Sequence, residues 1–423
     1  MGGWRQCKLG DLLEIKHGFA FLGEHFTRAG THIVLTPGNF YDEGGFKQKG
    51  DKDKWYNGPI PADYVLNEGD LLVAMTEQAE GLLGSSAIIP RSGVYLHNQR
   101  LGLVQIRDRK QAEQRFIYYL FNSEPVRQQI RASASGVKIR HTAPSRIADV
   151  KVCVPPLPVQ MRIAGILSPY DELIENNERR IRILEAMART LYREWFVHFR
   201  FPGHQKLKLV TSSLGNIPLG WGLAILRDLT TKIGSGATPR GGKEAYHTEG
   251  IALIRSLNIY DYEFEFSNLA YIDNEQATQL DNVVVEAGDV LLNITGASVA
   301  RCSMVPSYIL PARVNQHVAI IRANPQCMNP YYLLDTINND QNKQRLLGLA
   351  QGGATREALT KDTISNLPIL LPPRDLISRY GEVAGPLHAQ RETLYRQIHN
   401  LRRTRDLLLP RLLSGQMELA SMK

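Results

Sequence analysis

Two segments of the chain carry apolar or small side chains at intervals that alternate between four and three residues. The first series consists of Ile163, Leu167, Tyr170, Ile174, Asn177, Ile181, Leu184, Ala188, Leu191 and Trp195. The second series lies 217 residues further on, runs from Tyr380 to Leu412, and includes Arg391 and Arg405. This alternation is the heptad pattern of a coiled-coil helix, whose apolar stripe must be buried. We therefore expect two long helices that pair antiparallel; the alternative is that each packs on its own domain.

A proline lies at the same place in each heptad segment. Pro169 and Pro386 are again 217 residues apart. A proline inside a helix removes one backbone hydrogen bond, and its ring collides with the preceding turn. We therefore expect each long helix to kink or restart at its proline.

The segment before each long helix reads as a mixed α/β domain. Short apolar runs bounded by turn residues predict strands, for example GDLLVAM, SAIIP and LGLVQIR. Residues 113–131 and 331–347 have the spacing of apolar positions that is typical of helices. Each segment closes with an apolar run, VKVCVPP or LPILLPP, whose double proline cannot continue a central strand.

The two halves of the chain are copies of one another. The matches at a shift of 217 residues include Asn98-Gln99 with Asn315-Gln316, Gly136 with Gly353, and Pro155-Pro156 with Pro372-Pro373. A repeat of this length indicates two copies of one domain, because solenoid repeats are far shorter. We predict an α+β chain with domains at 1–157 and 201–373, and spacer helices at 158–200 and 374–423.

Composition adds weaker constraints. The 423 residues are 43% hydrophobic and 22% charged, and the net charge of +8 permits a nucleic-acid partner without requiring one. The four cysteines are scattered and form no C-x-x-C pair, which argues against a disulfide framework or a structural zinc site. No signal peptide and no apolar run of about 20 residues occurs. We therefore expect a soluble, cytoplasmic protein.

The sequence contains no complete catalytic motif. A DNA amino-methyltransferase needs Asn or Asp before its Pro-Pro pair, whereas the residues here are Val154 and Leu371. Gly234-Ser235-Gly236 lacks the third glycine of a dinucleotide loop, and no G-x-x-x-x-G-K-[ST] is present. The eleven histidines show no metal-ligand spacing. The sequence therefore predicts a protein that is not an enzyme.

The first long helix ends in the aromatic stretch LYREWFVHFRFPG, residues 191–203. Leu191 and Trp195 lie on the apolar stripe, but Tyr192, Phe196 and Phe199 face elsewhere. Such side chains either pack against the adjacent domain or form a docking surface for another subunit, since aromatic residues are enriched in interfaces. The candidates for partner docking are Trp195, Phe196 and Phe199.

Two domains of one design, each followed by a long helix ending in LYREWFVHF or LLLPRLLSGQM, resemble the specificity subunit of type I restriction–modification systems. Four stretches resemble that family's second target-recognition domain: GNIPLGW (215–221), SGATPR (235–240), TGAS (295–298) and the run at 351–356. The first domain departs from the pattern, because HGFAFLG (17–23) stands where the second has GSGATPR. The resemblance covers essentially the whole chain.

The resemblance implies a function and a set of partners. It implies a non-catalytic subunit that reads a bipartite target in double-stranded DNA, one half-site per target-recognition domain. Its partners would be two modification (methyltransferase) subunits, which carry S-adenosylmethionine, and restriction (endonuclease/translocase) subunits, which use ATP and magnesium; this chain would bind no cofactor. The alternatives are a recognition subunit of another restriction–modification type, or a coiled-coil scaffold that binds protein.

Candidate DNA contacts are polar residues in turn-like stretches. Arginine suits guanine, asparagine and glutamine suit adenine, and lysine suits phosphate. The candidates in the first domain are Asn98, Gln99, Arg100, Lys138, Arg140 and His141. Those in the second are Thr238, Arg240, Lys243, Arg255, Asn258, Asn315, Gln316 and Arg356. The alternative for each is a solvated charge or a turn-stabilising amide, and residues shared by both domains suit a phosphate or folding role better than sequence discrimination.

Overall fold

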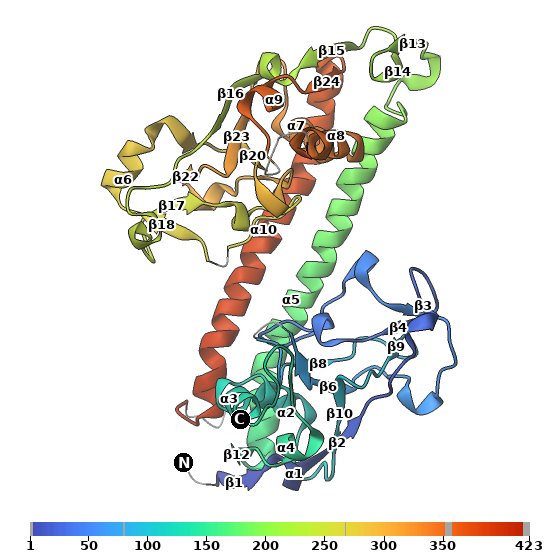
Figure 1. Cartoon of the computed structure of the whole chain (residues 1–423), viewed down its shortest axis with the longest axis vertical. Coiled ribbons are helices and arrows are strands. Elements are labelled where there is room, and N and C mark those ends of the chain that lie inside the picture. Colours follow the sequence, from blue (N-terminus) through green and yellow to red (C-terminus); the bar gives the residue numbers. More distant parts are fainter. Residues whose placement is uncertain (1–2, 79–80, 267, 352–357, 418–423) are drawn as a thin grey trace. The chain divides into compact units, whose positions relative to one another are not determined.

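The computed structural model describes residues 3–78, 81–266, 268–351 and 358–417 of the chain (Figure 1). The chain forms two compact units. Unit 1 contains residues 1–175 and 398–423, and unit 2 contains residues 176–397. Each unit therefore combines a globular part with a segment of both long helices.

The globular part of unit 1 is built from two four-stranded sheets. The first is antiparallel, with the order β2 (Leu13–His17), β10 (Leu101–Ile106), β6 (Leu71–Ala74) and β8 (Ser86–Ile88). The second has the order β3 (Phe26–Thr27), β5 (Trp55–Tyr56), β4 (His32–Val34) and β9 (Tyr95–Leu96), with β4 and β9 parallel. Two short strand pairs complete the globular part of unit 1. They are β1 (Arg5–Lys8) with β12 (Lys151–Val154) and β7 (Thr76–Glu77) with β11 (Arg140–His141).

Unit 2 repeats the order of the antiparallel sheet and three strands of the second sheet. Its antiparallel sheet has the order β16 (Thr230–Ser235), β23 (Val318–Ala323), β20 (Val290–Asn293) and β21 (Cys302–Met304). Its second sheet has the order β18 (Ala270–Ile272), β17 (Ile251–Ile254), β22 (Ala312–Val314) and β19 (Val284–Val285), with β17 and β22 parallel. The pair β15 (Gly222–Ile225) with β24 (Pro368–Leu371) is added, as is the hairpin β13 (Leu209–Ser212) with β14 (Gly215–Pro218). The α+β fold and its duplication are thereby confirmed.

Helices cover the antiparallel sheet of each unit. Unit 1 has α1 (Leu9–Leu12), α2 (Gln114–Phe121), α3 (Glu124–Ala132) and α4 (Pro144–Ala148). In unit 2 these helices are α7 (Pro330–Asn338), α8 (Asp340–Gln351) and α9 (Lys361–Ser365), whereas α6 (Asn274–Gln279) packs with the second sheet. The helical patterns at 113–131 and 331–347 thus correspond to helix pairs, α2 with α3 and α7 with α8. Phe116 and Phe121 of α2 are fully buried in the core of unit 1 with Leu71 and Val73 of β6.

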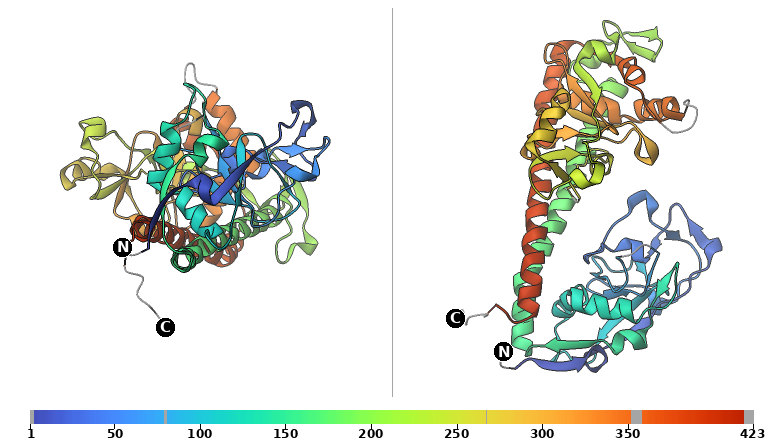
Figure 2. Two further views of the ribbon diagram at one scale, coloured as in Figure 1. Left: turned by 90° about the horizontal axis from the view of Figure 1, so that it is seen from below. Right: turned by 60° about the vertical axis from the view of Figure 1, so that its left-hand side comes forward.

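The two long helices are α5 (Leu157–Tyr192) and α10 (Arg374–Leu413), and they lie side by side within each unit (Figures 1 and 2). Every position of both predicted heptad series is buried or half-buried. In unit 1, Arg405 Nη1 donates to Asp171 Oδ1 at 2.7 Å. In unit 2, Asn177 Nδ2 donates to Gln397 Oε1 at 3.3 Å. Higher numbers on α5 meet lower numbers on α10, so the predicted antiparallel pairing is confirmed.

The prediction that either helix restarts at its proline is wrong. Helix α5 continues through Pro169, and helix α10 continues through Pro386. Both prolines are exposed, so each ring lies on the solvent side of its helix. The buried stripe on either side of the proline holds the helix together despite the lost backbone hydrogen bond.

Candidate nucleic-acid interface

The asparagine of each Asn-Gln pair stabilises a turn. Asn98 and Asn315 are both buried. Asn98 Oδ1 accepts the backbone N–H of Arg100 at 3.1 Å, and Asn315 Oδ1 accepts that of His317 at 3.0 Å. Both are Asx turns, in which a side-chain oxygen replaces a backbone acceptor. Stabilising the turn therefore accounts for Asn98 in unit 1 and for Asn315 in unit 2.

A glycine lies directly against each of these turns. A Cβ on Gly18 would be 2.1 Å from the carbonyl oxygen of Asn98, and one on Gly236 would be 1.6 Å from that of Val314. No side chain fits at either position, because such distances lie well inside van der Waals contact. This explains why the two divergent stretches HGFAFLG and GSGATPR share a glycine at this point.

Unit 2 brings two of the predicted residues into one polar chain. Thr238 Oγ1 donates to Gln316 Oε1, and Gln316 Nε2 lies 3.2 Å from His317 Nε2. His317 Nδ1 in turn lies 2.7 Å from Thr295 Oγ1, in the TGAS stretch. His317 and Thr295 were missed by the sequence analysis, although His317 directly follows the Asn-Gln pair. These side chains present hydrogen-bonding groups at one end of the antiparallel sheet.

Unit 1 brings together three backbone elements that also occur in unit 2: the Asn-Gln turn, the segment at Thr76 and the segment that pairs with it. The N–H of Met75 donates to the carbonyl of Arg100 at 2.9 Å, so the Asn-Gln turn lies beside β7. Strand β7 pairs in turn with β11, which carries Arg140 and His141. In unit 2, Thr295 forms the equivalent bridge with Ala358. The predicted residues Arg100, Arg140 and His141 are thus brought together, and Lys138 is exposed in the turn before β11.

The remaining candidates of unit 2 lie elsewhere. Asn258 is fully buried, where its Oδ1 accepts the N–H of Arg255 at 3.0 Å and its Nδ2 donates to the Glu265 carbonyl at 2.9 Å. The Arg255 guanidinium lies 5.0 Å from the ring centre of Tyr246. Asn258 is therefore a turn-stabilising amide, which is the alternative the sequence left open.

Two further candidates lie in or near loops. Arg240 is exposed two residues after Thr238. Lys243 belongs to the short 3-10 turn Gly242–Ala245. Arg356 lies outside the described residues, and its proposed role stays a prediction.

Two buried charges that sequence reasoning missed anchor the loop after β7. Glu77 Oε2 accepts the backbone N–H groups of Gly81 and Leu83 at 3.2 and 2.8 Å. Arg127 of α3 donates to the carbonyls of Leu83 and Asp42 at 2.9 and 2.8 Å, and also to that of Gly81. Burial lowers the pKa of Arg127 to about 10. Neither residue could be found from sequence, because both look like ordinary surface charges of a helix and a strand.

His97, which precedes Asn98, makes unit 1 sensitive to acid. Its ring is fully buried with Nε2 2.9 Å from the Leu101 carbonyl, and burial lowers its pKa to about 4. The unfolded imidazole takes up a proton near pH 6.5, so the free energy of unfolding falls as the pH drops from 6.5 to 4. We expect a loss of about 2 kcal/mol between pH 7 and pH 5 in urea unfolding. His97→Gln should remove this loss and the exposed control His17→Gln should retain it; equal pH dependence in both variants would contradict the assignment.

The aromatic stretch at the end of α5 is part of the core of unit 2. Trp195 and Phe196 are only 8% and 4% exposed. The Phe196 ring centre lies 4.7 Å from that of Tyr332 and 5.0 Å from that of Tyr380. Phe199 is half-buried, 5.3 Å from Trp221. Packing within the chain, one of the two alternatives, accounts for these rings, and a docking role stays a prediction.

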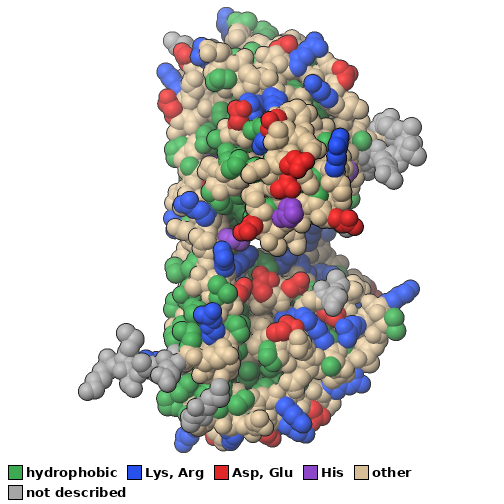
Figure 3. Space-filling view, turned by 90° about the vertical axis from the view of Figure 1, so that its left-hand side faces the viewer, with side chains coloured by type: hydrophobic (Ala, Val, Ile, Leu, Met, Phe, Trp, Pro, Cys, Tyr) green, Lys and Arg blue, Asp and Glu red, His purple; other side chains and the backbone are tan. Residues whose placement is uncertain are grey.

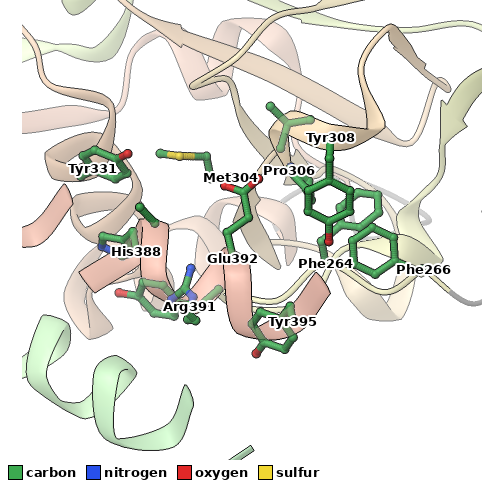
Figure 4. Close-up of a pocket in the computed structure, with 13 residues that line it drawn as sticks. Phe264, Phe266, Met304, Pro306, Tyr308, Tyr331, His388, Arg391, Glu392 and Tyr395 are labelled. Atoms are coloured by element: carbon green, nitrogen blue, oxygen red, sulfur yellow. The ribbon is translucent and has the colours of Figure 1, made fainter. Parts of the chain in front are cut away.

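A pocket in unit 2 is lined mainly by aromatic rings (Figure 4). Phe264, Phe266 and Tyr308 form one wall, and Tyr331 stacks on His388 of α10 at 5.2 Å. Glu392 Oε1 accepts the N–H and the hydroxyl of Ser307 at 2.8 and 2.7 Å. Such a lining suits packing of apolar groups. Among the residues that the structure describes, no cluster of His, Cys, Asp and Glu could hold a metal ion.

Surface charge does not by itself mark a DNA-binding face. On the face shown in Figure 3, acidic and basic side chains are interspersed over both units. In the described part of the chain, no helix is both long and apolar enough to cross a membrane.

Comparison with known proteins relates the chain to one family. Residues 1–186 match the family described as type I restriction modification DNA specificity domain. The chain is 24% identical over 310 residues to the type I restriction enzyme MjaIX specificity subunit of Methanocaldococcus jannaschii, covering 71% of this chain and 68% of that protein. It is 23% identical over 410 residues to the EcoBI specificity subunit of Escherichia coli, covering 94% and 82%.

The fold agrees with these sequence matches. The crystal structure of a type I restriction–modification S subunit from M. genitalium aligns with a TM-score of 0.63 at 14% identity, covering 97% of this chain and 96% of that one. The chain is thus similar to type I restriction–modification specificity subunits, and the family match lies in its first 186 residues.

Proposed function

We propose that this chain reads a bipartite DNA target and directs methylation and cleavage by partner subunits in the cytoplasm. Each globular domain, 1–157 and 201–373, would contact one half-site, and the spacer segments 158–200 and 374–423 would hold the two domains. Two modification subunits carrying S-adenosylmethionine would bind this chain, and restriction subunits using ATP and magnesium would join them. The chain's own contribution is recognition alone.

One observation carries this proposal. Both units assemble the same three elements at the end of the antiparallel sheet: the Asn-Gln turn, the strand segment at Thr76 or Thr295, and the segment that pairs with it. The buried turn residues are shared, whereas the side chains outside the core differ, as with the exposed Arg100 in unit 1 and the half-buried His317 in unit 2. Identical scaffolds with different exposed groups fit the reading of two different half-sites, since base edges are distinguished by hydrogen-bond pattern.

The proposal assigns DNA contact to the exposed members of these constellations. They are Arg100, Lys138 and His141 in unit 1, and Thr238, Arg240 and Gln316 in unit 2, and the half-buried Arg140 is assigned with them. Asn98, Asn258 and Asn315 act in folding because their side chains are buried in turns.

The test is methyl transfer by purified proteins. We expect no methylation or cleavage of DNA by the chain alone, and methylation once it is combined with its modification subunits and S-adenosylmethionine. Modification subunits without this chain serve as the control and should show no sequence preference. Methyl transfer by the single chain, or sequence-specific methylation in its absence, would contradict the proposal.

A further inference from the structure

The turn between α3 and β11 presents aliphatic side chains to solvent. Val137 is 99% exposed and Ile139 is 49% exposed. Two backbone hydrogen bonds close the turn. The N–H of Ser135 donates to the His141 carbonyl at 3.0 Å, and the N–H of His141 donates to the Ser135 carbonyl at 2.8 Å. Gly136 has a φ of +101°, and a Cβ there would lie 2.0 Å from the Ile139 carbonyl oxygen. A fixed turn therefore holds Val137 outward.

The surroundings of this tip are basic. Residues 133–141 contain Lys138 and Arg140 but no aspartate or glutamate. Arg146 Nη1 donates to the carbonyl of Ser133 at 2.8 Å and to Ser135 Oγ at 3.1 Å, which adds a cation at the base of the turn. An apolar tip flanked by cations suits a polyanion with an apolar group on its surface better than it suits a neutral protein surface.

The equivalent positions of the second domain carry other residues. The turn glycine Gly136 recurs as Gly353, whereas Val137 and Ile139 correspond to Ala354 and Arg356 in the sequence. The glycine is shared in the sequence, and the residues that follow it differ. This is the pattern expected where a common scaffold reads different bases.

We propose that Val137 reads a thymine in the half-site of the first domain by contacting its C5-methyl group in the major groove. The inference rests on the proposed function. Base edges in the grooves carry hydrogen-bonding groups, and the thymine methyl is their one apolar group. A valine side chain has no donor or acceptor, so this methyl is the base-edge group it can recognise. Lys138, which is exposed beside it, would then face a neighbouring phosphate.

The experiment compares thymine with deoxyuridine, which lacks only the methyl group. Binding is measured for the full chain in complex with its modification subunits, on target DNA in which each thymine is replaced in turn. One methyl group is worth about 0.8 kcal/mol, so we expect a loss of about fourfold at a thymine of one half-site. Val137→Ser should show a similar loss on thymine DNA and no further loss on uracil DNA, whereas Val137→Ile should bind as the wild type does.

The control variant is Met161→Ser, because Met161 is also exposed (58%) but lies on α5. It should retain both affinity and the response to uracil. Wild-type binding that is indifferent to uracil at every thymine would overturn the proposal. An equal loss of affinity for Val137→Ser on thymine DNA and on uracil DNA would also overturn the proposal, because it would indicate a wedge between bases or a protein contact. A wild-type complex with no preference for its target over scrambled DNA would instead contradict the proposed function itself.

Discussion

Replacing Phe196 with alanine is expected to lower the free energy of unfolding of unit 2 by about 3–5 kcal/mol. The ring is 4% exposed and lies among Trp195, Tyr332 and Tyr380, at centre-to-centre distances of 4.7 to 6.2 Å. Its removal leaves a cavity between the end of α5, helix α7 and helix α10, which cannot close without moving three helices. Urea unfolding of the full chain, followed by tryptophan fluorescence, measures the loss.

Phe199→Ala is the matched control for this variant. Phe199 is half-buried against Trp221, so about 1–2 kcal/mol is expected. A pull-down of the modification subunit beside the unfolding measurement separates packing from docking. Weakened assembly by Phe196→Ala with unchanged stability would show that the ring docks a partner and would contradict its assignment to the core.

A comparable loss, about 3–5 kcal/mol, is expected for Asp335→Ala. Asp335 of α7 is fully buried, and its Oδ2 accepts the Tyr380 hydroxyl at 2.6 Å and lies 3.2 Å from His388 Nε2. Burial, together with the nearby Asp335 charge, raises the pKa of Tyr380 well above its ordinary value, so its hydroxyl stays a donor. Alanine would leave two buried polar groups of α10 without their acceptor, which is costly in a dry core.

Glu382→Ala provides the control, because Glu382 is an exposed acid on α10, the helix that carries Tyr380 and His388. Its effect should stay within about 0.5 kcal/mol. Thermal melts of both variants give the comparison. If Asp335→Ala melted within 1–2 °C of the wild type, the link between α7 and α10 would not contribute to stability in the way described.

The sequence predicts the parts of the fold that depend on short-range spacing or on the internal repeat. The heptad intervals specify the buried stripe of α5 and α10, and they hold even at Arg405, whose charge is paired with Asp171. The duplication accounts for the order that the two antiparallel sheets share. The continuous helix through Pro169 was not predictable from the local rule, because burial on both sides outweighs one lost hydrogen bond.

The candidate site depends on contacts between distant segments and was only partly predictable. Residue type selected Thr238 and Gln316, but their hydrogen bond spans 78 positions and appears only in the fold. Asn258 is an amide of the kind that reads bases, but its side chain is buried and stabilises a turn. Val137 was missed because direct readout was sought among polar side chains, whereas its signal is exposure.

The sites methylated in the reconstituted reaction test the central claim most directly. DNA is treated with the modification subunits and this chain, and the methylated positions are mapped by sequencing. We predict one motif made of two fixed half-sites separated by a spacer of unread bases, and substitutions at Arg100 or Arg140 should relax only one of the half-sites. The same motif in a reaction without this chain, or no common motif with it, would contradict the claim that this protein specifies the DNA sequence.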